Sequence, residues 1–135
     1  MFIRRIVLVL LILGCSVGLA TAEWLKILTV SNPDGFTVYG DFATHRIDKK
    51  GLVKMWFLYD YKRAQKDYQV PYMSVRIQRQ YDCQEERART LAQSLFDGNM
   101  ALGDLVSEDS RERTWGPVAP GTLGETMWKV ACGKL

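Results

Sequence analysis

The chain is poor in the residues that build metal centres and covalent active sites. It has three cysteines and one histidine in 135 residues, and no CxxC or HxxxH pair occurs. A phosphate-binding loop, a zinc motif and a glycine-rich nucleotide fingerprint are also missing. These gaps argue against the common metalloenzymes and nucleotide-binding enzymes, and we predict a protein that is not an enzyme and uses no cofactor.

The chain also lacks a large excess of positive or negative charge. Lys and Arg number 18 and Asp and Glu number 15, which gives a net charge of +3, and the basic residues are interspersed with acidic ones, as in "YDYKRAQKD". The massed basic stripe that neutralises phosphates is absent, so we expect no nucleic-acid partner. With 47% apolar and 24% charged residues, the composition is that of one ordinary globular domain.

Long hydrophobic runs are limited to the N-terminus. Arg4 and Arg5 precede an apolar stretch over residues 6–20, which is shorter than the roughly 20 residues that a membrane-spanning helix needs. The small residues around Ala22 fit a signal-peptidase site. We predict that residues 1–22 are a secretory signal peptide and that residues 23–135 form one exported domain, in the periplasm or at the outer cell surface.

A second processing route starts from a cysteine in the same segment. Gly14 and Cys15 have the small residue and the cysteine of a bacterial lipoprotein signal, whereas Leu13 fits that pattern poorly. Lipidation of Cys15 would tether the domain to a membrane surface. We expect a membrane partner only in that case.

Removal of residues 1–22 leaves two cysteines, Cys83 and Cys132. An even number of cysteines in an exported chain indicates a disulfide. The bridge would close a loop of 50 residues counting both ends, for which the chain-entropy model gives a stabilisation of about 4 kcal/mol. Two alternatives stay open, a metal site shared with His45 and a nucleophilic cysteine with His45 as its base.

Alternation of apolar and polar residues predicts several strands. In "MSVRIQRQYDC", Met73, Val75, Ile77 and Tyr81 share one face. The other predicted elements before Cys83 are strands over 23–31, 35–42 and 52–61 and polar connections over 43–51 and 62–71. The two long strands on either side of the second connection are expected to pair antiparallel.

The C-terminal part contains one ambiguous segment and one clear helix. Over residues 85–96, the spacing of apolar residues favours a helix, although alternate residues also share one face of a strand. Further on, Thr122 and Glu125 form a capping box and Gly133 supplies a stop. We therefore predict a short helix that carries Cys132 in its last turn.

A set of segments follows in order along the chain after residue 22. They are Trp24, "TVYGD" ending at Asp41, "VKMWFLYDY", "YMSVRIQRQYDC", Arg87 and Arg89, "WGPVAPGT" and the terminal "ACGK". Together they resemble the surface-adhesin protein E-like domains of Gram-negative bacteria. The resemblance implies an α+β fold, with a single antiparallel sheet of about five or six strands and a short C-terminal helix packed on it and tethered by a disulfide. It also implies a strand over residues 85–96, export, and adhesion to host extracellular-matrix and plasma proteins in the named member.

A binding role directs attention to the surface. Arg76 and Arg79, on the polar face of "MSVRIQRQYDC", are the candidate binding residues for a protein partner, and an exposed edge strand could pair two copies as a homodimer. Trp24, Trp56 and Trp115 are expected as core or sheet-face aromatics rather than ligand contacts. The alternative function is a periplasmic structural or stress-related envelope protein without a role in host adhesion.

Overall fold

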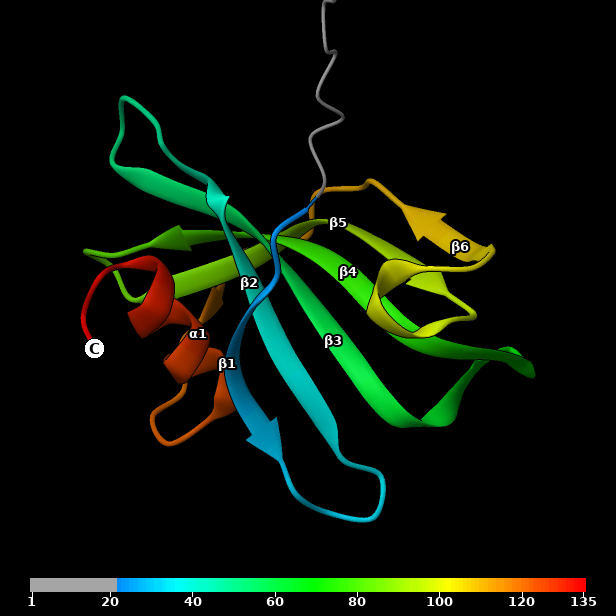
Figure 1. Ribbon diagram of the computed structural model, residues 1–135. Helices are drawn as coiled ribbons and strands as arrows, with labels where there is room; N and C mark the ends of the chain where they lie inside the picture. Colours follow the sequence, from blue (N-terminus) through cyan, green and yellow to red (C-terminus); the bar gives the residue numbers. More distant parts are fainter. Residues whose placement is uncertain (1–21) are drawn as a thin grey trace, which may run out of the picture.

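Seven strands and one α-helix make up residues 22–135, the part of the chain that the computed structural model describes (Figure 1). The strands are β1 (Leu25–Val30), β2 (Phe36–Ile47), β3 (Leu52–Asp67), β4 (Val70–Asp82), β5 (Arg87–Phe96), β6 (Leu105–Asp109) and β7 (Gly116–Pro117). The helical elements are the 3-10 turn η1 (Asn99–Ala101) and the helix α1 (Leu123–Ala131).

The strands follow one another across a single antiparallel sheet. Their order is β1-β2-β3-β4-β5-β6, and the short strand β7 pairs with β5. Consecutive strands joined by hairpin connections give this order directly, because neighbours in sequence become neighbours in the sheet. The structure confirms the predicted fold class, and β7 is one strand more than the five or six expected.

One face of the sheet carries the hydrophobic core. Its side chains are those that alternate along the central strands, and α1 covers them (Figure 1). The buried core residues are Val38, Val53, Met55, Phe57, Val75, Ile77, Tyr81, Leu95, Met127, Trp128 and Ala131. The last three come from α1, so the helix forms the second layer of the fold.

The polar segments on either side of β3 belong largely to strands. β2 continues into the connection predicted over 43–51, and β3 and β4 run through the one predicted over 62–71, so both predictions are wrong in extent. Only Tyr68 and Gln69, with φ of 44° and 73°, form the turn between β3 and β4. Polar side chains do not prevent pairing here, because antiparallel strands tolerate solvent on their faces.

Residues 87–96 form the strand β5, so the helix favoured by their apolar spacing is wrong and the strand implied by the family resemblance is confirmed. β5 pairs with β4 along one side and with β6 and β7 along the other. Neighbours on both sides therefore satisfy its backbone hydrogen bonds. This tertiary pairing overrides the local helical spacing.

α1 begins at the predicted capping box and is tethered at its other end. The Thr122 hydroxyl accepts a hydrogen bond from the Glu125 N–H at 3.2 Å. Cys132, the C-cap residue, forms a disulfide with Cys83, which follows β4 directly. The structure thus confirms both the helix and the cysteine pairing.

Two further hydrogen bonds hold α1 against the sheet. The Trp128 indole donates to the Asp82 carbonyl at 3.1 Å, and His45 Nε2 lies 2.8 Å from the Ala131 carbonyl oxygen. The alternative of a nucleophilic cysteine with His45 as its base is wrong, because the bridge uses both cysteines of the domain.

The predicted signal-peptide core and the alternative lipidation site, Cys15, lie outside the described residues. Across residues 22–135, no helix combines the length and the apolar character required for a membrane span.

Candidate functional site

The sheet face opposite α1 carries aromatic and polar side chains. One cross-strand row on this face runs from β2 to β6 through Tyr39, Leu58, Arg76, Ser94 and Glu108. Leu58 and Ser94 are buried, whereas Glu108 is exposed. The row places an arginine at the centre of a face that α1 does not cover.

The segment between β5 and β6 folds back over one end of this face. The Asp60 carboxylate accepts a hydrogen bond from the Met100 N–H at 2.8 Å. The fully buried Ser74 hydroxyl donates to the Gly98 carbonyl at 2.6 Å and accepts from the Ala101 N–H at 2.9 Å. These contacts fix the segment over the end of the face where Asp60 and Ser74 lie.

Arg76 is held between two aromatic rings. Its guanidinium carbon lies 5.1 Å from the ring centroid of Trp56 and 5.6 Å from that of Phe96. The buried Nε–H has no hydrogen-bond partner, and no carboxylate of residues 22–135 lies within ion-pair distance of the guanidinium. Stacking thus positions a cation whose charge is not neutralised within the described fold, an arrangement suited to binding an anionic group.

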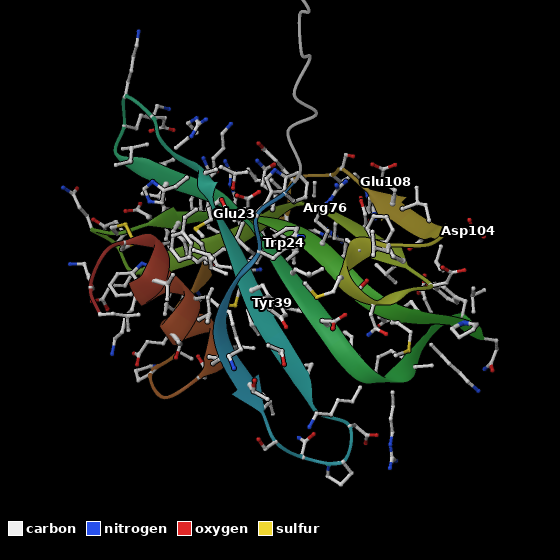
Figure 2. The ribbon with its side chains drawn as sticks, in the orientation of Figure 1. Glu23, Trp24, Tyr39, Arg76, Asp104 and Glu108 are labelled. Carbon is white, nitrogen blue, oxygen red and sulfur yellow. A yellow bond between two sulfur atoms is a disulfide. The ribbon has the colours of Figure 1, made fainter. Side chains whose placement is uncertain are left out.

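A hollow of about 430 Å³ lies beside this guanidinium. Its lining residues are Ala22, Trp24, Asp41, Ala43, Thr44, Trp56 and Arg76. Figure 2 shows Trp24 and Arg76 near each other, with Glu23 next to Trp24. The volume falls within the roughly 300–1,000 Å³ of small-molecule sites, so the hollow has room for a ligand group.

An irregularity in β2 shapes one wall of the hollow. The pairing of β2 with β3 is interrupted between Asp41 and Arg46. The Thr44 hydroxyl donates to the Asp41 carbonyl at 2.6 Å and accepts from the Trp56 N–H at 3.0 Å. The buried Asp41 carboxylate accepts from the Ala43 N–H at 3.2 Å. Interruptions of this kind re-aim side chains and are frequent beside functional sites.

Arg79 lies on the opposite face of β4 from Arg76. It pairs across the strands with the core residue Met55, and its Nη1 donates to the Thr90 hydroxyl at 2.6 Å. Residues an odd number of positions apart point to opposite faces of a strand. The expectation that both arginines lie on one polar face is therefore wrong, and of the two only Arg76 lines the hollow.

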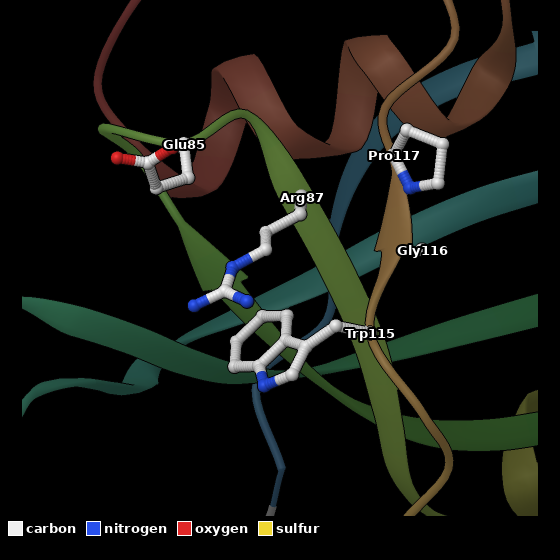
Figure 3. A pocket seen from close by; sticks show the side chains of 5 residues that line it. All are labelled: Glu85, Arg87, Trp115, Gly116 and Pro117. Atoms are coloured by element: carbon white, nitrogen blue, oxygen red, sulfur yellow. The ribbon is translucent and has the colours of Figure 1, made fainter.

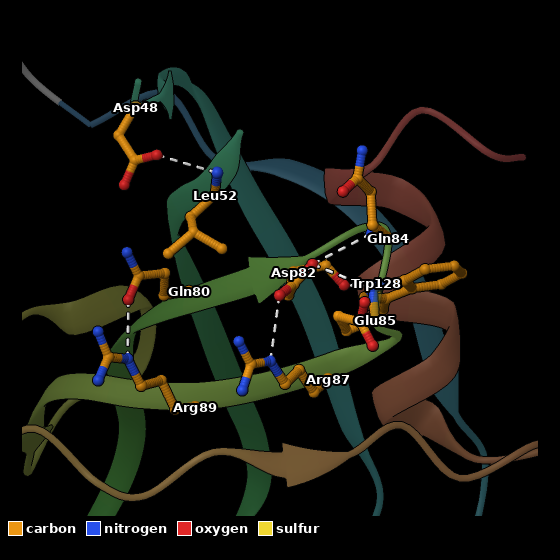
Figure 4. Close-up of polar contacts among 9 residues, drawn as sticks. All are labelled: Asp48, Leu52, Gln80, Asp82, Gln84, Glu85, Arg87, Arg89 and Trp128. Atoms are coloured by element: carbon orange, nitrogen blue, oxygen red, sulfur yellow. Dashed lines mark hydrogen bonds and ion pairs between the residues drawn. The ribbon is translucent and has the colours of Figure 1, made fainter. Parts of the chain in front are cut away.

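A second polar cluster surrounds Asp82 at the end of β4 (Figure 4). Its carboxylate accepts hydrogen bonds from the Gln84 N–H, the Glu85 N–H and Arg87 Nε, each at 3.1 Å. These bonds, of which the one from Glu85 has the largest effect, hold the pKa of Asp82 below its usual range. The cluster closes the turn between β4 and β5, so we assign it to the fold.

Another hollow, of about 620 Å³, lies beside Trp115 (Figure 3). The guanidinium carbons of Arg87 and Arg89 each lie 4.6 Å from the ring centroid of Trp115. Both arginines already have carboxylate partners, Asp82 at 3.1 Å and Glu112 at 3.4 Å. Because their charges are neutralised within the fold, the hollow beside Arg76 is the stronger candidate.

The side chains of residues 22–135 do not support the alternative of a metal site. Residues 22–135 contain no group of three or more His, Cys, Asp or Glu side chains placed to hold a metal ion. His45, the proposed partner in a metal site, instead lies against the end of α1.

The surroundings of Arg76 were only partly readable from the sequence. Strand alternation places Trp56 and Arg76 on the same face of the sheet, and this pattern could have identified the two side chains as neighbours. Trp24 and Phe96 come from distant parts of the chain, and the interrupted pairing that places Asp41 has no mark in the sequence. The hollow as a whole was therefore missed.

Comparison with known proteins supports the fold. A family model described as surface-adhesin protein E matches residues 24–133. Crystal form II of Haemophilus influenzae protein E is 15% identical, with a TM-score of 0.63 over 80% of this chain and 87% of that chain. A second structure of that protein is 15% identical, with a TM-score of 0.61 over 80% and 83%. Its selenomethionine form is 14% identical, with a TM-score of 0.62 over 84% and 88%. No curated protein sequence matches significantly.

Proposed function

Because the chain belongs to the surface-adhesin protein E family, we propose that it is an exported, non-catalytic protein that binds a protein partner at the hollow beside Arg76. Family membership supports a cell-surface, adhesin-like role in general. Within that role, the proposed partner is a host extracellular-matrix or plasma protein.

The observation that carries this proposal is that the Arg76 guanidinium has no polar partner within residues 22–135. A half-buried arginine that serves the fold ordinarily has a hydrogen-bond partner within it, as Arg87 has in the Asp82 carboxylate at 3.1 Å and Arg79 has in the Thr90 hydroxyl at 2.6 Å. Arg76 instead is stacked between Trp56 and Phe96, with no carboxylate of residues 22–135 in ion-pair range. Aromatic side chains and arginine are also the types enriched among residues that dominate binding energy at interfaces.

Binding to immobilised partners tests the proposal. The natively exported protein is applied at increasing concentration to a panel of matrix and plasma proteins. We expect saturable binding to at least one of them, with an affinity at least tenfold weaker for Arg76→Met, which keeps an apolar stem between the two rings. Arg111→Met is the matched control, because its side chain is 83% exposed and lies outside the hollow.

A second arm addresses the alternative function. A periplasmic structural or stress-related protein would bind a component of the envelope extract and none of the host proteins. That result would replace the adhesin-like role. Saturable binding to a host protein that Arg76→Met leaves unchanged would keep the role but move the site elsewhere.

Maturation and assembly belong to the same proposal. Cleavage after Ala22 would release residues 23–135, whereas lipidation would anchor the chain at Cys15. Mass spectrometry of the native protein distinguishes the two by mass. The edge strand β1 is where a second copy would add if the protein forms a homodimer, and sedimentation of the same sample reports the oligomeric state.

A further inference from the structure

The walls of the hollow beside Arg76 offer two indole rings. Trp24 precedes β1 and Trp56 lies on β3, and both line the same space. Indole rings bind flat ligand faces that carry C–H groups, because the ring face is electron-rich and the C–H edge of the ligand is slightly positive. A saturated ring with polar substituents at its rim presents such a face.

The charges around the hollow favour a ligand with a single negative group. Arg76 supplies one unpaired cation, and Glu108 lies in the same cross-strand row. Glu23 lies next to Trp24 (Figure 2), and Asp41 lines the hollow. A polyanion would approach these carboxylates as well as the guanidinium, and like charges repel. One carboxylate on an otherwise neutral ligand fits better than a chain of phosphates or sulfates.

Asp41 adds carboxylate oxygen atoms that have room for further hydrogen-bond donors. Asp41 as a residue is 6% exposed, and its carboxylate accepts one hydrogen bond within residues 22–135, from the Ala43 N–H. An ionised carboxylate has about four acceptor positions. Ligand hydroxyl groups are donors that would use the remaining positions.

From these three features we propose that the hollow binds a sugar carrying one carboxylate, such as a uronic-acid or sialic-acid unit of a glycan. The carboxylate pairs with the Arg76 guanidinium, the ring stacks on an indole, and ring hydroxyls donate to Asp41. The inference rests on the proposed function, because it names the group that the same site recognises on its partner. Cleavage after Ala22 would remove none of the aromatic or charged residues that line the hollow.

Titration of the natively exported protein with small probes tests this recognition. Glucuronic acid and N-acetylneuraminic acid are added while the indole N–H resonances of Trp24 and Trp56 are followed by NMR. We expect saturable shifts with at least one of these acids. Glucuronamide, which replaces the carboxylate by a neutral amide, should bind at least tenfold more weakly, and so should N-acetylglycine, which has the carboxylate but no sugar ring.

Substitutions of Arg76 test whether its guanidinium binds the carboxylate of the sugar. Arg76→Met should weaken binding of the acidic sugar at least tenfold, and Arg76→Lys, which keeps the charge without the planar fork, should weaken it less. Thermal unfolding of both variants confirms that they fold. If Arg76→Met does not fold, the affinity of Arg76→Lys for the acidic sugar is the test. An affinity equal to that of the wild type, in whichever of the two variants folds, would overturn the proposal.

The sugar inference and the proposed function fail in different ways. If glucuronamide or N-acetylglycine binds as well as both acids, the sugar specificity is refuted. If the acids do not bind and glycosidase treatment of the partner protein leaves its Arg76-dependent binding intact, the inference is overturned while the proposed function stands. If partner binding is independent of Arg76, the proposed site itself is refuted.

Discussion

Removal of the disulfide should lower stability by an amount that the loop length sets. Cys83 and Cys132 are 49 positions apart, and closing a loop of this size stabilises the folded state by about 4 kcal/mol through the entropy of the unfolded chain. Residues 23–135 comprise 113 residues, so with an unfolding entropy of about 2.1 cal/mol/K per residue this loss lowers Tm by roughly 17 °C. The change to make is Cys83→Ser together with Cys132→Ser.

Thermal unfolding followed by circular dichroism measures this shift. The reduced wild-type protein is the matched control, because reduction opens the same loop without changing side-chain size elsewhere. It should unfold close to the double variant. If the oxidised wild type and the double variant unfold within about 2 °C of each other, loop closure is not what stabilises the domain, and the reasoning from chain entropy fails.

Three further predictions concern single side chains. Asp82→Asn should lower the free energy of unfolding by about 1–2 kcal/mol at neutral pH. The pKa of Asp82 is lowered in the fold, so its carboxylate stabilises the folded state fully at pH values above its ordinary pKa of about 3.9. The contribution falls as the pH drops through the lower folded pKa, and the Tm difference between variant and wild type should shrink in acid. Gln69→Gly should stabilise by up to about 1 kcal/mol in urea unfolding, because φ at this turn position is 73°. Ser74→Ala should cost about 1–3 kcal/mol in the same assay, since the part-buried Ala101 N–H loses its acceptor. An unchanged midpoint for Asp82→Asn or Ser74→Ala would contradict the assigned hydrogen bonds, and an unchanged midpoint for Gln69→Gly would contradict the assigned strain at this turn position.

The strands with one apolar face were predictable from the sequence, and so was the C-terminal helix. Alternation in β3 and β4 reports burial on one side of a sheet, and the capping box at Thr122 is a local hydrogen bond between Thr122 and Glu125. The disulfide followed from the even number of cysteines in an exported chain. Each of these predictions depends either on residues that are close together in the sequence or on the number of cysteines.

The errors arose where distant pairing decides the outcome. Residues 87–96 have helical spacing, and only the strands on both sides of β5 make them extended. The polar residues 62–67 belong to β3, and residues 65–67 pair with β4, because backbone pairing does not depend on their side chains. Arg79 was placed with Arg76, although strand alternation puts them on opposite faces. The hollow beside Arg76 joins four separate segments, so local patterns could not assemble it.

The central claim is that the face opposite α1, and not the core face, provides the binding site. Arg76→Met and Arg79→Met make the same chemical change on opposite faces of β4. The most direct measurement is the affinity of both variants for the immobilised host protein that the wild type binds. The structure predicts at least a tenfold loss for Arg76→Met and less than a twofold change for Arg79→Met in folded protein. Equal losses, or a larger loss for Arg79→Met, would contradict it.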